Sequence, residues 1–343
     1  MDKRIEYDRV YSFDVLKAIM AFMVCIIHWS DQSDYYYLVP TRIAVPVFIA
    51  ISGYFWPKEK EKQISQIKKI FTLLIGALLF YFGFYFILKL SNRSLHQWLS
   101  EVFSIRAIME CLVFNRAKLG GHLWYLFAVL YTMIITMILQ EKKCEKLFPC
   151  LCVAGVLGLL IAGKYSLLLL GSDVPTFYTK TYYCVGIPFF AFGMYLKSEQ
   201  AQAWIEKVPN LLVLTWIILF CASGFLEKAV LRYFSVEGTR DFYISTVLLV
   251  GAIMVFAVKN QKFGYSFPLL RRIGEKYSGT IYVIHIAVIT VVSKGVGLFA
   301  VIDYLYHKIG FILVFFISLA FSVVWEKRKH FRSLIEASKG GHK

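Results

Sequence analysis

The chain has 343 residues, of which 58% are hydrophobic and only 17% are charged. Soluble domains carry about a quarter charged residues, so the composition excludes an ordinary soluble globule. It also excludes a disordered chain and a small disulfide-linked secreted domain. Aromatic residues make up 17%. The composition therefore predicts a protein that is surrounded by lipid.

The formal net charge of +16 does not indicate a nucleic-acid-binding protein. The Lys and Arg residues stand in short clusters between long apolar runs, as in the inner loops of membrane proteins. No nucleic-acid-binding motif accompanies them, so no nucleic-acid partner is expected. The seven Cys residues have no C-x-x-C spacing and lie mostly in or beside apolar runs. They are interpreted as small apolar side chains, and neither a disulfide framework nor a metal site is expected.

Ten segments are apolar enough to be membrane-spanning helices, each of which needs about 20 mostly apolar residues. In chain order they are 11–30, 41–56, 68–90, 122–140, 147–163, 181–196, 209–226, 242–258, 278–299 and 308–325. The second and sixth are short and contain Pro46 and Pro188, so we expect them to be tilted, kinked or partly re-entrant. No cleavage-site pattern follows the first segment, which is expected to remain as a helix. The predicted fold class is all-α, a polytopic membrane bundle of about ten transmembrane helices.

Loop charges predict the orientation of this bundle. With the N-terminus in the cytoplasm, the inner segments hold roughly twice as many Lys and Arg residues as the outer ones, which favours an N-in, C-in topology. We expect one transmembrane domain over residues 1–326 and a basic cytoplasmic tail over residues 327–343. In the outer loop 91–121, the amphipathic stretch from Leu95 to Phe114 is expected to lie on the outer surface as a cap.

Ionisable residues within a span are costly and therefore point to function. Lys17 and His28 are eleven residues apart in the first span, within about 20° of one helix face and about 16 Å apart along the axis. His285 lies about 10 Å deep in the ninth span. Each residue also has a structural interpretation. Lys17 can snorkel to the inner interface, and either histidine can be a buried residue that hydrogen-bonds to a neighbouring helix.

Asp31 follows His28 by three residues and would share its helix face if the helix continued, where it could orient the imidazole. In the second span, Pro46 and Ser52-Gly53 interrupt the helix pattern, as in broken helices that line a cavity, although a kink for packing is equally consistent.

Aromatic residues open the fourth span at its outer end, in the run His122-Leu-Trp124-Tyr125. An interfacial aromatic belt also provides Trp and Tyr at this level, so the run is a weak signal by itself. The chain contains no P-loop, dinucleotide fingerprint, H-E-x-x-H or G-x-S-x-G motif.

In their order along the chain, several segments together resemble acyltransferase family 3, a family of bacterial integral-membrane acyltransferases. The run from Tyr11 to His28 is similar to the family's first helix, in which a basic residue precedes a His by eleven positions. Further similarities lie in Arg42 to Phe55, Lys68-Lys69, His122 to Leu126 and Tyr277 to His285. The resemblance covers nearly the whole chain. Where the family usually has Arg, this chain has Lys17, which offers a point charge in place of a planar fork.

The resemblance implies transfer of an acyl group, usually acetyl, from acetyl-CoA or a related thioester to a hydroxyl of an extracytoplasmic glycan or lipid-linked sugar. It also implies a multi-pass protein of the bacterial cytoplasmic membrane, in contact with membrane lipid. His28 would be the general base, and His285 would assist it. The residues expected to bind the donor are Lys17, Arg42, Lys68, Lys69, Ser52 and Tyr54, with Arg271 and Arg272 as further candidates. Those expected to bind the acceptor are His122, Trp124, Tyr125 and Asp31.

Two functions of other classes are alternatives to acyl transfer. A transporter or flippase for a glycan or small anion would use the basic stripe as its path, although the near absence of acids in the spans and of an internal repeat argues against ion-coupled transport. A membrane scaffold or sensor would need no reactive His28. The sequence does not identify the acceptor, the acyl group or the oligomeric state.

Overall fold

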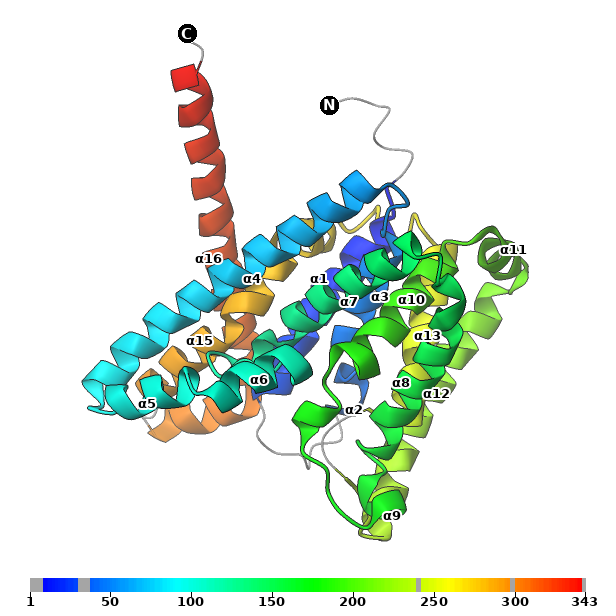
Figure 1. Cartoon of the computed structure of the whole chain (residues 1–343), viewed down its shortest axis with the longest axis horizontal. Helices are drawn as coiled ribbons and strands as arrows, with labels where there is room; N and C mark the ends of the chain where they lie inside the picture. The colour runs from blue at the N-terminus through cyan, green and yellow to red at the C-terminus, as the bar shows by residue number, and fades with distance from the viewer. Residues whose placement is uncertain (1–8, 30–37, 239–241, 297–299, 341–343) are drawn as a thin grey trace. The chain divides into compact units, whose positions relative to one another are not determined.

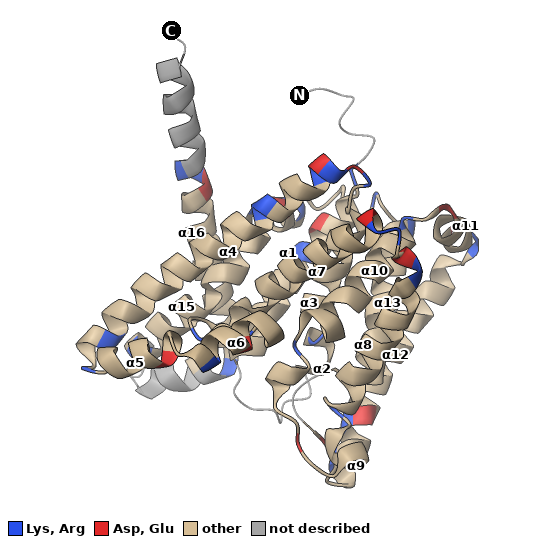
Figure 2. Ribbon diagram, viewed as in Figure 1, with Lys and Arg blue, Asp and Glu red and all other residues tan. Residues whose placement is uncertain are grey.

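A computed structural model describes residues 9–29, 38–238, 242–296 and 300–340. Every regular element within these ranges is a helix (Figure 1). The chain divides into two compact units. Residues 1–32 and 260–343 form unit one, and residues 33–259 form unit two. Figure 2 shows that Lys, Arg, Asp and Glu gather near the helix ends and are sparse in the middles of the helices, which is the pattern of membrane-spanning helices.

Each of the ten predicted spans coincides with a helix. Six helical stretches of the described chain are long and apolar enough to cross a membrane. They lie in α1 (Tyr11–Trp29), α4 (Lys60–Ser91), α7 (Trp124–Glu141), α12 (Asn210–Tyr233), α15 (Ser278–Val296) and α16 (Ala300–Gly340). The shorter apolar helices are α3 (Ala44–Tyr54), α8 (Phe148–Ile161), α10 (Ile187–Leu196) and α13 (Ile244–Lys259). The all-α membrane fold is confirmed.

Unit one is built on α1, which packs against α15, α16 and the π-helical turn Ile273–Tyr277. This turn follows α14 (Pro268–Arg272) and leads into α15. A Cβ atom on Gly274 would stand 1.7 Å from the carbonyl oxygen of Asp14, so only glycine permits this approach of the two backbones. Towards the other end of α1, the edge of Trp29 meets the ring of Tyr306 on α16, with centroids 3.9 Å apart.

The centre of unit two is the contact between α3 and α10. A Cβ atom on Gly53 would lie 2.0 Å from the Phe190 carbonyl oxygen, and one on Gly193 would lie 1.9 Å from the Ala50 carbonyl oxygen. Small residues that let two backbones approach closely are typical of helix pairs in membranes. Both helices belong to the predicted spans that contain a proline.

Local sequence explains how these two helices begin. A separate four-residue helix, α2 (Leu38–Thr41), precedes α3, and a π-helical turn, Tyr182–Gly186, precedes α10. Pro188 lies in the first turn of α10, where its missing N–H breaks no helical hydrogen bond. The predicted irregularity of these two spans is thus located at their starts.

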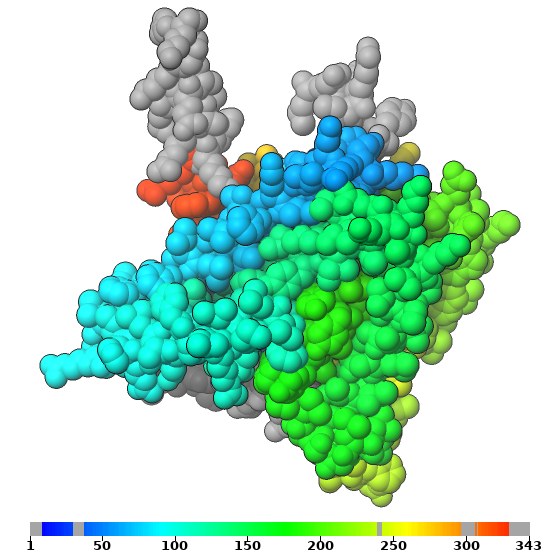
Figure 3. Space-filling model, in the orientation of Figure 1, coloured from blue at the N-terminus to red at the C-terminus, as the bar shows by residue number. Residues whose placement is uncertain are grey.

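The amphipathic stretch 95–114, which was predicted to lie on the outer surface as a cap, forms two helices. These are α5 (Leu95–Val102) and α6 (Ile105–Phe114). Ser104 separates them, since its hydroxyl accepts a hydrogen bond from the Ala107 N–H and caps α6. Trp98 packs on Phe82 of α4, with ring centroids 5.7 Å apart. In Figure 3 the cyan side chains of α5 and α6 form one surface with the end of α4.

The predicted boundary at residue 326 between the transmembrane domain and the basic tail falls within a helix, and the division itself stays a prediction. Helix α16 continues without a break from Ala300 to Gly340. The boundary at residue 326 therefore marks a change of composition within one helix.

A polar cluster joins the ends of α12 and α13 in unit two. The Glu237 carboxylate accepts hydrogen bonds from Lys164 at 3.2 Å, Arg232 at 3.1 Å and the Tyr243 hydroxyl at 2.9 Å. Lys228 stands 3.9 Å away, and both lysine side chains are almost fully buried. Burial favours the neutral acid, but the charge of Lys164 and the hydrogen bonds outweigh it, so the pKa of Glu237 lies below its ordinary value.

Gly274→Ala should destabilise unit one, because the new methyl group would meet the backbone of α1, which cannot move aside as a side chain can. We expect a loss of about 1–3 kcal/mol, measured as a lower thermal unfolding midpoint in detergent. Gly279→Ala, one turn later in α15, is the matched control, since its Cβ would meet nothing within 4 Å. Equal midpoints for the two variants would contradict the close contact.

Glu237→Gln should lower the thermal unfolding midpoint, because it leaves buried cations without their shared carboxylate. The folded-state pKa is depressed, so this stabilisation is present above the ordinary Glu value of 4.5 and is lost as the pH falls through the folded-state pKa. The difference between the wild type and Glu237→Gln should therefore be constant near neutral pH and shrink under acid. A difference that grows below pH 4.5 would contradict the assigned ionisation.

Candidate functional site

His28 and His285 lie side by side in unit one, with ring centroids 5.1 Å apart and ring planes at 42°. His28 is in the last turn of α1 and is exposed, whereas His285 in α15 is completely buried. The predicted catalytic pair is thus assembled from two helices that are far apart in the sequence. Such an arrangement gives one imidazole access to a substrate and the other a fixed position behind it.

The position of His285 determines its tautomer. Its Nδ1 lies 2.7 Å from the carbonyl oxygen of Tyr282 and 3.3 Å from that of Ile281. A carbonyl oxygen only accepts hydrogen bonds, so Nδ1 carries the proton and donates. In the neutral ring the lone pair is consequently on Nε2. The same hydrogen bonds hold the ring against its own helix.

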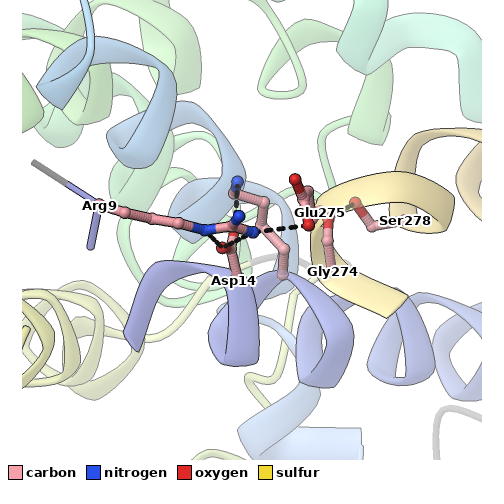
Figure 4. A network of polar contacts seen from close by, with 6 residues as sticks. Arg9, Asp14, Gly274, Glu275 and Ser278 are labelled. Atoms are coloured by element: carbon pink, nitrogen blue, oxygen red, sulfur yellow. Dashed lines mark hydrogen bonds and ion pairs between the residues drawn. The ribbon is translucent and has the colours of Figure 1, made fainter. Parts of the chain in front are cut away.

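Lys17 belongs to a network of charges near the start of α1. Figure 4 labels three of its members, Arg9, Asp14 and Glu275. Asp14, which is largely buried, accepts a hydrogen bond from Lys17 Nζ at 3.0 Å and two from Arg9 at 3.0 and 2.8 Å. Arg9 also forms an ion pair with Glu275 at 2.6 Å. The hydrogen bond to Glu275, with the contribution of Asp14, raises the pKa of Arg9 against the effect of burial.

Arg9, Asp14 and Glu275 were missed in the sequence analysis. The i, i+3 spacing of Asp14 and Lys17 could have revealed their ion pair, because such residues share a helix face. Nothing in the local sequence could have revealed Glu275, which reaches this network only because Gly274 lets the π-helical turn contact α1.

A further guanidinium group, that of Arg271, and two tyrosine rings lie beside this network. The Arg271 guanidinium stands over the Tyr11 ring at 4.7 Å and over the Tyr265 ring at 5.6 Å, and Arg9 stands 5.7 Å from the same Tyr11 ring. Cation–π contacts orient the planar guanidinium. Arg272, next in the chain, is exposed. Arg271 therefore shares the Tyr11 ring with Arg9, and Arg9 shares Asp14 with Lys17, so this end of unit one gathers cations of the types that bind phosphate.

In unit two, Ser52 and Tyr125 come together although they were predicted to serve different substrates. Ser52 on α3 donates to the Phe48 carbonyl oxygen at 2.9 Å and is hydrogen-bonded to the Tyr125 side chain. The Phe48 and Tyr125 rings are 6.1 Å apart. A hydroxyl pair from two different helices is thus placed within the unit.

The predicted donor-binding residues of unit two do not gather in one place but lie at opposite ends of α3 and on α4. Tyr54 is hydrogen-bonded to Gln202 near the end of α3, and Lys68 and Lys69 are exposed on α4. Arg42 precedes the start of α3 and interacts electrostatically with Tyr243, a residue of the Glu237 cluster. Because α3 has 11 residues and is about 16 Å long, Arg42 and Tyr54 do not bind the same small group.

His122 and Trp124 are held by the structure around the start of α7. His122 is buried in a short 3₁₀ turn, with its ring 4.8 Å from that of Tyr81. The Trp124 carbonyl oxygen accepts a hydrogen bond from Asn115, a fully buried residue in a left-handed conformation. Asp31 lies outside the described residues, so its prediction stays untested. Within the described chain, no group of three His, Cys, Asp or Glu residues is placed to hold a metal ion.

Comparison with known proteins adds one finding. A protein-family model described as an acyltransferase domain matches residues 10–326, which is nearly the whole chain. No curated protein and no solved structure matches the chain.

Asp14→Asn should lower the thermal unfolding midpoint by an amount equivalent to about 1–2 kcal/mol, because Arg9 and Lys17 lose the carboxylate that they share. Combining it with Arg9→Gln should cost less than the sum of the two single changes. Glu61→Gln, an exposed carboxyl on α4, is the control. Strict additivity of the two changes would show that Arg9 and Asp14 are not coupled.

Proposed function

The chain belongs to acyltransferase family 3 and is a multi-pass membrane acyltransferase, and on that premise we propose that it transfers an acyl group from acyl-CoA to a hydroxyl. The acyl group is acetyl, and the acceptor is a glycan or a lipid-linked sugar of the cell envelope. The protein acts in the bacterial cytoplasmic membrane. The observation that carries the proposal is the contact of His28 with His285 in the same unit as the cations around Lys17.

His28 is the general base of this reaction. Its imidazole takes the proton of the acceptor hydroxyl while the oxygen attacks the thioester carbonyl carbon. The carbon–sulfur bond then breaks, and the leaving thiolate receives the proton from the His28 imidazolium. The products are the acyl ester and free CoA, so atoms and charge balance. The exposure of His28 and its place in the last turn of α1 are consistent with an acceptor that approaches from outside.

His285 supports His28 from α15. Its Nδ1–H is held by the Tyr282 carbonyl, so its neutral ring presents a fixed lone pair on Nε2. A neutral neighbour does not oppose the positive charge that His28 gains on accepting a proton, whereas a second imidazolium would.

The donor phosphates are bound at the opposite end of α1. Lys17 and Arg9 are held there by Asp14 and Glu275, and Arg271 is held by Tyr11. Because Lys17 and His28 are about 16 Å apart along one face of the helix, the pantetheine arm of the donor runs along that face.

With the full chain in nanodiscs, acetyl-CoA as donor and an envelope glycan as acceptor, His28→Ala should lose about 10²–10⁴-fold in thiol release, the usual contribution of a general base, while CoA binding is retained. His285→Ala should lose less, because that residue acts through His28. His96→Ala, an exposed histidine on α5, is the matched control and should leave the rate unchanged.

The outcomes separate the parts of the proposal. Unchanged thiol release by a folded His28→Ala variant would remove His28 as the base. Failure of the folded wild type to bind any acyl-CoA would overturn the donor. Donor binding without thiol release until an envelope glycan is added would identify the acceptor class.

A further inference from the structure

Unit two contains a groove of about 680 Å³ between α8 and α12, with α10 and α13 as its floor. The lining side chains are aliphatic and aromatic with few polar atoms, and they include Phe192, Trp216 and Phe220. None of the lining residues belongs to the proposed acyl-transfer site.

The groove exists because its two wall helices differ in length and because a glycine on its floor, Gly251, has no side chain. Helix α8 has 14 residues, about 21 Å, which is shorter than the roughly 30 Å of a hydrocarbon core, while α12 has 24 residues. Only 11% of the most apolar part of α12 is buried, so this wall faces lipid. On the floor, a Cβ atom at Gly251 would meet only the Phe192 ring, at 4.0 Å.

An aromatic pair marks one end of the groove. Trp204 of α11 (Glu199–Lys207) stacks on Trp216 of α12, with centroids 6.2 Å apart and planes at 8°. Helix α11 is amphipathic, burying Ala201 and Ile205 and exposing Trp204. Amphipathic helices and Trp residues lie at the level of lipid headgroups. The Trp204 end of the groove is therefore its headgroup end.

Basic residues surround this end. Lys197 and Lys207 are exposed at either end of α11, and Lys259 donates to the last carbonyl groups of α11. A second hollow of about 530 Å³ shares Cys152 and Phe192 with the groove and extends to the loop that contains Lys142, Lys143 and Lys146. Although Glu145, Glu199 and Glu206 are interspersed, the lysines outnumber them, so the rim is complementary to an anion.

We propose that this groove binds an acyl chain of an anionic phospholipid from the leaflet that contacts α11. The acyl chain of the lipid lies on Gly251 and Phe192 between α8 and α12. The lipid phosphate lies at the level of α11, near Lys197 and Lys207. The site is independent of acyl transfer. The bound lipid is expected to stabilise the packing of α8 and α12, which differ in length.

The probe for this site is phosphatidylglycerol with a photoactivatable diazirine in one acyl chain, used in phosphatidylcholine nanodiscs that contain the full chain. After illumination, adducts should concentrate on peptides of α10, α12 and α13. Gly251→Leu, which fills the floor, should lower their yield about tenfold, as expected when roughly two methylene groups of the lipid lose their burial. Gly83→Leu is the matched control, because it adds the same side chain on lipid-facing α4, where a Cβ meets nothing within 4 Å.

Three outcomes would overturn the proposal. Equal adduct yields from the wild type and Gly251→Leu would remove the groove as the site. Equal labelling by a phosphatidylcholine probe would remove the anionic headgroup. A covalent dimer formed by a bismaleimide through Cys152, with no lipid adduct, would assign the groove to a second copy of the chain. If Gly251→Leu does not fold, Trp216→Ala tests the same groove by removing the aromatic pair, and unchanged labelling would again contradict the site.

Discussion

The hydrocarbon core of a membrane offers no hydrogen-bond partner to a backbone N–H or C=O group, and this constraint underlies the architecture of the chain. It requires helices wherever the chain crosses lipid, and it moves charges to the helix ends, where Figure 2 shows them. The charges that remain partly buried are shared among several partners. Glu237 is surrounded by cations from two segments, and Asp14 is held by Arg9 and Lys17.

Because lipid provides no hydrophobic force between helices, helix association depends largely on close van der Waals contact between their backbones. Gly53 and Gly193 bring α3 and α10 together, and Gly274 brings the π-helical turn against α1. The last contact has a chemical consequence, because it delivers Glu275 to Arg9 and leads directly into the helix that carries His285. In unit one, the helix contact at Gly274 therefore also positions residues of the candidate site.

Within unit one, chemistry is distributed along a single helix. The histidine pair lies at one end of α1 and the cationic network at the other, so a substrate that binds both must be long. An acyl thioester with a phosphate-bearing head and an extended arm has that shape, which is why the family assignment and the geometry support the same proposal. The proposed lipid groove of unit two is a separate feature, formed by helix lengths and a missing side chain, and its lining is mostly apolar.

The sequence by itself determined the membrane class, the positions of the ten helical segments, the resemblance to the family and the identity of His28 and His285 as candidates. Long apolar runs and loop charges are local signals, and a sequence displays local signals directly. The sequence also predicted that the spans containing Pro46 and Pro188 are tilted, kinked or partly re-entrant. It did not predict that the irregular backbone lies at the starts of these helices.

Only the tertiary structure decided which of these residues meet. It paired His28 with His285 and Ser52 with Tyr125, separated Arg42 from Tyr54, and made Asp14 the shared partner of Arg9 and Lys17. These contacts join residues on different helices or depend on where a neighbouring helix packs. Apart from the Asp14–Lys17 pair, whose i, i+3 spacing places both residues on one helix face, no helical period encodes these contacts, because they depend on how separate segments of the chain pack.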